Sequence, residues 1–459
     1  MAHVSSVPRL VIGASGSGSG KTTVAVALIA ALKARGCKVA PFKCGPDYLD
    51  PGYHGRAAGV PSHNLDSWMM GRQAVAETFL HAAADADIAI IEGMMGLFDG
   101  TTPSSDEGST AEIAKWLGAP VLLVVDASGM ARTIGAVAAG FARFDTTLNM
   151  AGLICNRVGS RGHLELLRTA STEVPVLGGL PHTPEAAFPE RHLGLLTADE
   201  NNVPSARLEA WGKLAAEWFD LDAITGIARQ ASAIHLGSLP EEHAGRSPRT
   251  RCRVGIAWDQ AFQFYYDFNL AMLERLGAEL VRFSPTHDDL LPNVDGLYFG
   301  GGYPESVARQ LSANHTMRAA VREFAFSGRP IYAECGGLMY LVERIRLTNG
   351  DGFDMAGVLP GEARMNERLQ ALGYVEVETR ADSIIGPRGT RFRGHQFRYS
   401  TLEPPPDIID RLYRIVPRWG SGIFDEGYRS GNIVASYVHA HWASDPAIPG
   451  YFIEACTGG

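Results

Sequence analysis

The chain has no excess of positive charge and no apolar run long enough to cross a bilayer. Its 459 residues include 41 lysines and arginines against 50 aspartates and glutamates, a formal net charge of −9. Nucleic-acid binders need a basic face that replaces the counterions of phosphate, so this balance argues against that class. The longest apolar runs, such as Ala119–Val125, fall well short of the ~20 residues that span a membrane. We therefore expect neither nucleic acid nor a membrane as a partner.

The chain also lacks paired cysteine motifs. Its six cysteines are scattered and include no Cys-x-x-Cys pair. This usage suits a reducing cytoplasm and gives no support for a structural zinc site or a disulfide framework. Most of these cysteines are expected to be small buried apolar side chains. With no targeting signal apparent before the first glycine-rich loop, the expected location is the cytoplasm.

Two stretches of alternating strand and helix patterns are separated by a polar break. A chain of this length exceeds the ~250–300 residues at which single cores divide. Residues 236–250 are rich in Gly, Pro, Ser and charge, which predicts a linker between domains at 1–235 and 251–459. Apolar strands that alternate with helices indicate an α/β class with two doubly wound domains, of which the first has a mostly parallel sheet. The expected strands are Arg9–Ile12, Val39–Phe42, Ile88–Ile91, Val121–Val125, Gly152–Ile154, Arg253–Ala257, Leu280–Phe283, Gly296–Phe299 and Pro330–Ala333.

A glycine-rich loop follows the first expected strand and opens an expected helix at Thr22–Ala34. Backbone N–H groups of such a loop, with the positive end of the helix, form a cradle for phosphate. Lys21 is expected to reach the β- and γ-phosphates, and the Thr22 hydroxyl to ligate Mg²⁺. The strict P-loop pattern is not met, because Ser15 stands where its first glycine belongs. A dinucleotide-binding fingerprint is the alternative, but the spacing of the glycines fits it less well. We predict ATP and Mg²⁺ as cofactors, bound by Gly18, Gly20, Lys21, Thr22, Thr23, Lys43 and Asn156.

Acidic residues follow two of the expected strands. Ligands of open α/β sheets bind at that edge, and a carboxylate that ends an apolar strand is costly to bury without a partner. Asp47 and Glu92 are therefore predicted as metal or catalytic residues, with Asp99 as a further candidate. Asn156 follows another strand, and we expect it to hydrogen-bond the edge of a base.

The second half carries a candidate nucleophile. Cys335 lies between an apolar strand and two glycines that open a helix. This is the sequence of a nucleophile elbow, in which a sharp turn projects the side chain and the helix N-terminus favours thiolate. The N–H of Gly336 is placed to donate to an oxyanion. Gly302, in the glycine run after strand Gly296–Phe299, is the expected second donor.

A thiol nucleophile needs a base. His439 and His441 end an apolar strand, and in an extended chain they project to the same side. We predict one of them as the base and the other as the partner that orients it. A zinc site is the alternative, but no cluster of cysteines or carboxylates completes four ligands.

Eight segments resemble, in order along the chain, the cobyrinic/hydrogenobyrinic acid a,c-diamide synthases, which are glutamine-dependent amidases of corrinoid biosynthesis. In that family the N-terminal domain is similar to dethiobiotin synthetase and the C-terminal domain to class I glutamine amidotransferases of the triad type. The segments are FKCGPDYLDPGYH (42–54), HNLDSWMM (63–70), EGMMGLFDG (92–100), FGGGYPE (299–305), RPIYAECGGLMYL (329–341), GVLPG with MNERLQALGYVEV (357–377), RGHQFRYS (393–400) and SGNIVASYVHAHW (430–442).

The resemblance implies roles for matching residues. Lys21 and Thr22 match the ATP and Mg²⁺ residues. Cys335 matches the nucleophile and His439 its base, while His441 stands where many class I enzymes carry the glutamate of their triad. Asp47 and Glu92 match the acidic metal or catalytic positions, and segments containing Tyr48, Leu49 and Asp99 are implied to shape the site for the tetrapyrrole carboxylate.

The expected function is ATP- and glutamine-dependent amidation of the a and c carboxylates of cobyrinic or hydrogenobyrinic acid through an acyl phosphate. Its expected partners are a tetrapyrrole polycarboxylate and L-glutamine, and a homodimer stays open as an assembly. Related branches perform the same chemistry on sirohaem or Ni-sirohydrochlorin. A P-loop switch ATPase and an amino-acid or cell-wall ligase are the alternatives from other classes, and the first of them leaves Cys335 and His439 without a role.

Overall fold

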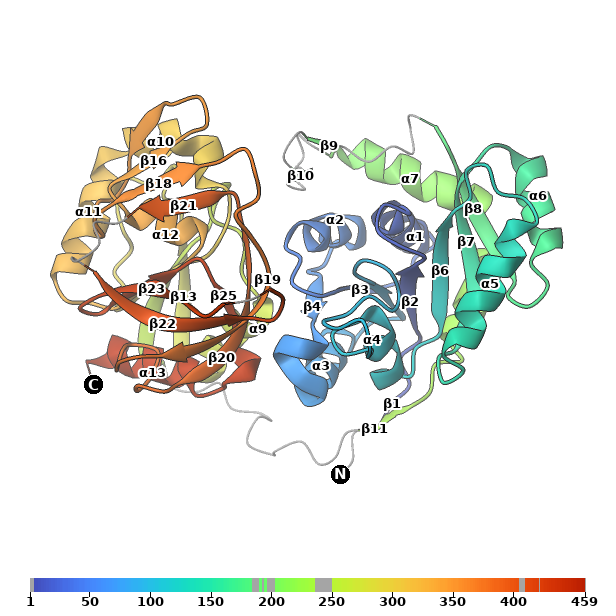
Figure 1. The fold of residues 1–459 in the computed structure, drawn as a ribbon, viewed down its shortest axis with the longest axis horizontal. Coiled ribbons are helices and arrows are strands. Elements are labelled where there is room, and N and C mark those ends of the chain that lie inside the picture. The colour runs from blue at the N-terminus through green and yellow to red at the C-terminus, as the bar shows by residue number, and fades with distance from the viewer. Residues whose placement is uncertain are drawn as a thin grey trace. The chain divides into compact units, whose positions relative to one another are not determined.

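A computed structural model describes residues 4–183, 190–191, 194–195, 203–235, 250–403, 409–420 and 422–458. They divide into two compact units, Met1–Glu241 and Glu242–Gly459, and each is described by itself (Figure 1). Almost all of the predicted linker, 236–249, lies outside the described residues, so its borders stay a prediction. None of the described helices combines the length and apolar character needed to cross a bilayer.

The first unit is built on a parallel sheet of seven strands in the order β4-β3-β5-β2-β6-β7-β8. Every residue of β2, β3 and β5 is buried, which is why these strands read as continuous apolar runs. The strands are β2 (Arg9–Ala14), β3 (Val39–Cys44), β4 (His63–Leu65), β5 (Ile88–Glu92), β6 (Val121–Asp126), β7 (Met150–Val158) and β8 (Val176–Pro181). Short pairs join β1 (Val4–Ser5) to β11 (Ile234–His235) and β9 (Glu190–Arg191) to β10 (Gly194–Leu195).

Helices connect these strands. α1 begins directly after the glycine-rich loop, as the sequence predicts. The helices are α1 (Lys21–Ala34), α2 (Leu49–Ala58), α3 (Ser67–Ala82), α4 (Thr110–Trp116), α5 (Thr133–Phe144), α6 (Arg161–Ala170), α7 (Ser205–Trp218) and α8 (Leu221–Ala228). Because β2, β3 and β5 are neighbours and parallel, the segments that follow them meet at one edge of the sheet.

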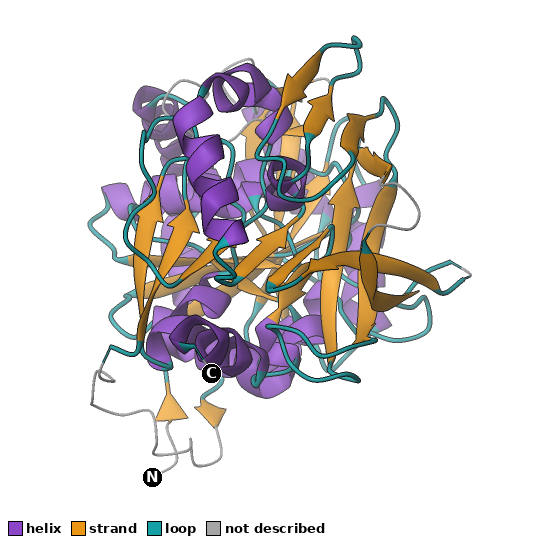
Figure 2. Cartoon of the chain, turned by 90° about the vertical axis from the view of Figure 1, so that its left-hand side faces the viewer, coloured by secondary structure: helices purple, strands orange, loops and turns teal. Residues whose placement is uncertain are grey.

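The second unit contains a sheet of ten strands in the order β13-β12-β14-β15-β24-β23-β22-β19-β20-β25 and a smaller sheet in the order β17-β16-β18-β21 (Figure 2). The part from β13 to β24 is parallel and the rest of the large sheet is antiparallel. The predicted class, two α/β units, is confirmed. The large sheet comprises β12 (Cys252–Ala257), β13 (Ala278–Phe283), β14 (Gly296–Phe299), β15 (Ile331–Glu334), β19 (Ala371–Thr379), β20 (Arg391–Arg398), β22 (Asp410–Pro417), β23 (Phe424–Ser430), β24 (Ile433–Ser436) and β25 (His439–His441).

The remaining elements of this unit surround the two sheets. The small sheet comprises β16 (Arg344–Arg346), β17 (Gly352–Asp354), β18 (Glu362–Met365) and β21 (Ser400–Glu403). The helices are α9 (Asp267–Arg275), α10 (Ala308–Ala313), α11 (His315–Phe326), α12 (Gly336–Leu341) and α13 (Ile448–Thr457), with 3₁₀ turns η3 (Pro304–Val307) and η4 (Trp442–Ser444).

The antiparallel part of the large sheet curls back on itself. Only two residues separate β24 from β25, yet four strands lie between them in the sheet order. That link reaches on the order of 10 Å, whereas five steps of ~4.8 Å would separate the two strands in a flat sheet. The sheet must therefore bend until β25 returns beside β24 and β15. This closure brings the histidines of β25 to the end of the strand that precedes Cys335.

Candidate functional sites

The glycine-rich loop of the first unit owes its shape to two glycines with positive φ. Gly18 has φ 78° and Gly20 has φ 90°, in the left-handed region that glycine adopts without strain. A Cβ at Gly20 would lie 2.0 Å from Nδ2 of Asn156. That amide donates to the carbonyl of Ser19 at 3.0 Å. Asn156, at the end of β7, thus holds the loop in place, a contact that the sequence did not predict.

Four buried ionisable side chains meet beside this loop; we call Lys43, Asp50, His54 and Glu92 the charged cluster. Their exposures are 3%, 4%, 0% and 1%. Lys43 and Glu92 are register neighbours on β3 and β5, and Nζ lies 2.9 Å from Oε1 of Glu92 and 2.5 Å from Oδ2 of Asp50. His54 Nε2 lies 2.5 Å from Oε2 of Glu92. The hydroxyl of Thr22 donates to Glu92 Oε1 at 2.8 Å, which joins the cluster to the phosphate loop.

The charges of this cluster shift the pKa values of its members to different extents. Burial alone would lower the pKa of Lys43, but Asp50 and Glu92 outweigh it and raise that pKa. Burial opposes ionisation of Glu92, yet Lys43 and His54 hold its pKa below the usual range. Burial and then the repulsion of Asp47 raise the pKa of Asp50.

For Lys21 the nearby carboxylates do not outweigh the cost of burial. Burial, followed by the like charge of Lys43, lowers the pKa of Lys21, whose Nζ donates to the carbonyl of Met95 at 2.5 Å. An anion bound next to Lys21 would relieve this penalty.

The structure places Asp50, not Asp47, next to Thr22. Asp47 Oδ1 accepts from the N–H groups of Leu49 and Asp50 at 2.8 and 3.0 Å, so this oxygen caps the start of α2. Asp50 Oδ2 lies 3.3 Å from the Thr22 hydroxyl, and its Oδ1 is buried without a hydrogen-bond partner among the described residues. Hydroxyl and carboxylate oxygens are the ligands that Mg²⁺ prefers. Thr22, Asp50 and Glu92 therefore fit that ion.

Sequence reasoning missed both Asp50 and His54. They are four residues apart on α2, a spacing that places two side chains on one face of a helix and that was the available signal. Among the other predicted residues, Tyr48 immediately precedes α2, Leu49 begins it and Thr23 lies in α1. Asp99 Oδ2 accepts from the N–H of Gly96 at 2.8 Å and so shapes the turn after β5.

Cys335 occupies a strained turn between β15 and α12. Its φ of 44° and ψ of −99° are unusual for a residue with a side chain, and such strain gathers at functional sites. Its N–H donates to the carbonyl of Ser436 at 2.7 Å, which ties the turn to the end of β24. The next position requires a glycine, because a Cβ at Gly336 would lie 2.9 Å from the amide nitrogen of Gly302.

The same close approach brings two backbone donors together. Gly336 is the first residue of α12, so its N–H has no partner within the helix. Gly302 has φ 152°, and a Cβ there would lie 2.0 Å from the carbonyl oxygen of Ala261. This packing is consistent with the predicted pair of oxyanion donors beside Cys335.

The side chain of His439 interacts with that of Cys335. Its side chain is 3% exposed on β25. Burial disfavours the charged ring, but interaction with Cys335 and then Glu334 raises the pKa of His439 to about 9. The raised pKa favours the imidazolium form of His439 at neutral pH. The ring needs the glycine at position 301, because a Cβ there would lie 2.2 Å from Cε1 of His439.

His441 lies in a different environment. Its ring packs against Tyr266 and Phe268, with centroids 4.7 and 5.2 Å apart, and its Nδ1 accepts from the N–H of Ala443 at 3.4 Å. Burial lowers the pKa of His441 to about 3, so the ring is neutral. The carboxylate beside His439 is Glu334, not a group on β25. The sequence missed it because alternation along a regular strand would turn Glu334 away from Cys335.

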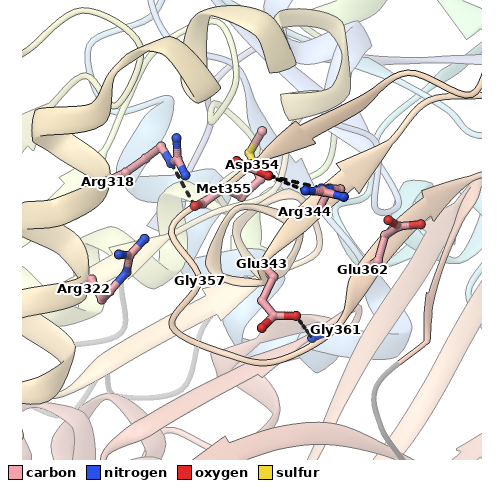
Figure 3. Close-up of a pocket in the computed structure, with 9 residues that line it drawn as sticks. All are labelled: Arg318, Arg322, Glu343, Arg344, Asp354, Met355, Gly357, Gly361 and Glu362. Carbon is pink, nitrogen blue, oxygen red and sulfur yellow. Dashed lines mark hydrogen bonds and ion pairs between the residues drawn. The ribbon is translucent and has the colours of Figure 1, made fainter.

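A separate pocket of about 570 Å³ lies on the second unit, and none of the candidate site residues lines it (Figure 3). Its arginines bind neighbouring groups: Arg344 pairs with Asp354, and Nε of Arg318 and of Arg322 donates to a backbone carbonyl at 2.8 and 2.9 Å. These contacts hold the loop after β17. The lining residues are Arg318, Arg322, Glu343, Arg344, Asp354, Met355, Gly357, Gly361 and Glu362.

The fold and the two candidate sites define a class of protein in which a nucleotide-binding unit is joined to a glutamine amidotransferase unit. Comparison with known families agrees: residues 10–195 match the CobQ/CobB/MinD/ParA nucleotide binding domain, and residues 253–447 match the CobB/CobQ-like glutamine amidotransferase domain. The chain belongs to the cobyrinate a,c-diamide synthase family.

Curated relatives match over nearly the whole length. The chain is 51% identical to the cobyrinate a,c-diamide synthase of Leptospira interrogans, over 98% of both chains. It is 46% identical to the cobyrinate a,c-diamide synthase of Syntrophotalea carbinolica, over 99% of both. It is 41% identical to the hydrogenobyrinate a,c-diamide synthase of Streptomyces coelicolor, over 98% of both.

Proposed function

We propose that this chain is a carbon–nitrogen ligase that converts the a and c carboxylates of cobyrinic or hydrogenobyrinic acid into carboxamides, with ATP and glutamine as co-substrates. The observation that carries the proposal is the pairing, on one chain, of the phosphate loop that ends in Lys21 with the buried pair of Cys335 and His439. Relatives of both names, cobyrinate and hydrogenobyrinate synthases, support the substrate class.

The first unit addresses the poor reactivity of a carboxylate towards ammonia. Transfer of the γ-phosphoryl group to the carboxylate gives an acyl phosphate and ADP, so that phosphate replaces oxide as the leaving group. Lys21 and the loop N–H groups bind the phosphates and stabilise their charge. Thr22, Asp50 and Glu92 would hold Mg²⁺, which supplies further neutralisation of phosphate charge when bound. Ammonia then attacks the acyl carbon and inorganic phosphate leaves.

The second unit supplies the ammonia. The Cys335 thiolate attacks the side-chain amide carbon of glutamine, and the N–H groups of Gly302 and Gly336 stabilise the oxyanion. His439 donates a proton to the departing nitrogen, which is released as ammonia. The glutamyl group stays bound to Cys335 as a thioester. Water, deprotonated by His439, then hydrolyses the thioester to glutamate and regenerates Cys335. Because free ammonia is largely protonated at neutral pH, local release provides the reactive base.

Mass spectrometry of the reaction products tests the substrate. The chain is incubated with ATP, Mg²⁺, glutamine and, in separate reactions, cobyrinic acid, hydrogenobyrinic acid, sirohaem and Ni-sirohydrochlorin. We expect two carboxyl groups of a corrinoid acid to become carboxamides, with ADP, phosphate and glutamate formed in step. Amidation of sirohaem or Ni-sirohydrochlorin alone would move the chain to one of those branches. Glutamine-independent ATP hydrolysis with no amide product would favour the switch ATPase.

Asp50 and Asp47 give a matched pair of variants. Asp50→Asn removes a charge next to Thr22 and Lys43, and we expect ammonia-driven amidation to fall by about 10²-fold or more with a higher Mg²⁺ requirement. Asp47→Asn keeps an oxygen that caps α2, so activity should fall far less. Steady-state rates across a Mg²⁺ titration measure both. If Asp47→Asn is the more damaging change, the assignment of Asp50 is wrong.

Two further properties remain proposals. The reactants are metabolites of the cytoplasm and all six cysteines are free, which supports a cytoplasmic location. A homodimer is the assembly to test by light scattering of the purified chain.

A further inference from the structure

We propose that Glu334 is a positioning residue for the amidotransferase reaction: its carboxylate orients His439 and stabilises the imidazolium that forms as Cys335 becomes a thiolate. This inference rests on the proposed function of the same site. It assigns to Glu334 the orienting role that the sequence analysis predicted for one of His439 and His441.

Glu334 is held so that one carboxylate oxygen faces the imidazole. It is the last residue of β15 and is 1% exposed. Its Oε1 accepts from the Tyr332 hydroxyl at 2.9 Å and from the N–H of Ala440 at 3.1 Å, which fixes the plane of the carboxylate. Oε2 accepts no hydrogen bond from any described residue and lies 3.8 Å from Nδ1 of His439.

A buried carboxylate of this kind is costly unless a cation or a donor faces it. His439 is the group in place to do so. A distance of 3.8 Å is an ion-pair separation, and catalytic hydrogen bonds often shorten only when substrate binds. With Nδ1–H directed at Glu334, Nε2 is the ring nitrogen left for Cys335. The carboxylate thus selects the tautomer in which the base can take the thiol proton.

The other titratable groups near this pair carry no charge at neutral pH. Burial, followed by the negative charge of Glu334, raises the pKa of the phenols of Tyr298 and Tyr332. Burial and then the charge of His439 lower the pKa of His395, on the neighbouring β20, to about 3. Burial also raises the pKa of the phenols of Tyr265 and Tyr413, and the negative charge of Glu334 contributes to each shift. Glu334 and the Cys335 thiolate are therefore the counter-charges of His439 among the described residues.

A purely structural role makes a different prediction. Glu334 also bridges β15 and β25 through Ala440, so its loss has a packing component. The variant Glu334→Gln keeps an acceptor oxygen for Tyr332 and Ala440 and removes only the charge. A structural role predicts little change in this variant, whereas a positioning role predicts loss of activity and a changed pH profile.

The experiment measures glutamine hydrolysis by the full-length chain as a function of pH. For Glu334→Gln we expect kcat/KM to fall by about 10²- to 10⁴-fold, the scale on which carboxylate partners of catalytic histidines act. Without the carboxylate the imidazolium is less stable, so the alkaline limb should move to lower pH by about one unit or more. Ammonia-driven amidation should stay near the wild-type rate. Glu426→Gln is the matched control: Glu426 is buried in the same unit and binds Ser436 and Tyr437, and its loss should not move the limb.

Two results would overturn the inference. One is a Glu334→Gln chain with wild-type kcat/KM and an unmoved alkaline limb. The other comes from nuclear magnetic resonance of ¹⁵N-histidine in Cys335→Ala, and it applies even if Glu334→Gln does not fold. We expect His439 in that chain to titrate above the usual histidine pKa and its neutral ring to carry the proton on Nδ1. An ordinary or lowered pKa with the proton on Nε2 contradicts the role. Neither assay needs a tetrapyrrole, so failure here is distinct from failure of the proposed amidation.

Discussion

Replacement of Cys335 by alanine should abolish amidation driven by glutamine and leave amidation driven by ammonium salts near the wild-type rate. The thiolate is the nucleophile that frees nitrogen from glutamine, and nothing else near His439 in the described structure can form the thioester. Loss of a catalytic nucleophile lowers a rate by about 10³-fold or more. Acyl phosphate formation does not use this side chain, so externally supplied ammonia should still reach the product.

Two assays separate these steps. Glutamate release without a tetrapyrrole reports the amidotransferase reaction, and carboxamide formation from ammonium chloride reports the synthetase reaction. Cys252→Ala is the matched control, because Cys252 is also buried, at 3% exposure against 7% for Cys335, but lies at the start of β12 and has no role in either site. Equal losses of glutamine- and ammonia-driven amidation in Cys335→Ala would contradict two separable sites.

Replacement of Lys21 by alanine should stop amidation with either nitrogen source. Lys21 is the buried cation of the phosphate loop and forms no ion pair with a carboxylate of the described residues, whereas Lys43 pairs with Asp50 and Glu92. Phosphoryl transfer depends on such charge stabilisation, so we expect a fall of about 10³-fold. Glutamine hydrolysis at Cys335 should persist.

The measurement is ADP formation that depends on the tetrapyrrole, with glutamine and then with ammonium as the nitrogen source. Lys33→Ala serves as the control, since Lys33 lies in the last turn of the same helix and is exposed. Substantial turnover by Lys21→Ala would refute the role of this lysine in phosphate binding, whether or not the variant still hydrolyses glutamine.

Most strands of the parallel part of each sheet could be predicted from the sequence because they are buried on both faces, but the edge strands β4 and β8 of the first sheet were missed. Val39–Phe42 and Ile88–Ile91 are uninterrupted apolar runs, and the observed strands β3 and β5 contain them. The antiparallel strands were missed for the opposite reason. β22 alternates exposed and buried residues, so its apolar signal is diluted by the solvent-facing side chains.

Helix α3 shows a further limit. The spacing of apolar residues predicts a helix at Ala74–Ala84, but the observed helix begins seven residues earlier, at Ser67, where Asp66 accepts from the N–H of Met69 and caps the first turn. Gly71 interrupts the helical backbone with φ 74° and ψ 166°. A glycine in a helical pattern reads as a boundary, whereas here the chain resumes the helix after it.

The sequence by itself determined the two local devices, the phosphate loop and the nucleophile turn. Both are made by consecutive residues: the glycines at 18 and 20 before Lys21, and Cys335 followed by Gly336. Their backbone conformations depend on glycine and on the adjoining strand and helix. In each case these features are encoded by one short stretch of consecutive residues.

Only the tertiary structure decided which groups face those devices. Asp50 rather than Asp47 meets Thr22 because α2 begins after Asp47 and carries the next carboxylate towards β5. Glu334 rather than His441 faces His439 because the sheet curls and returns β25 to the end of β15. Side-chain partners across strands depend on closure of the sheet, a long-range property that spacing along the chain does not contain.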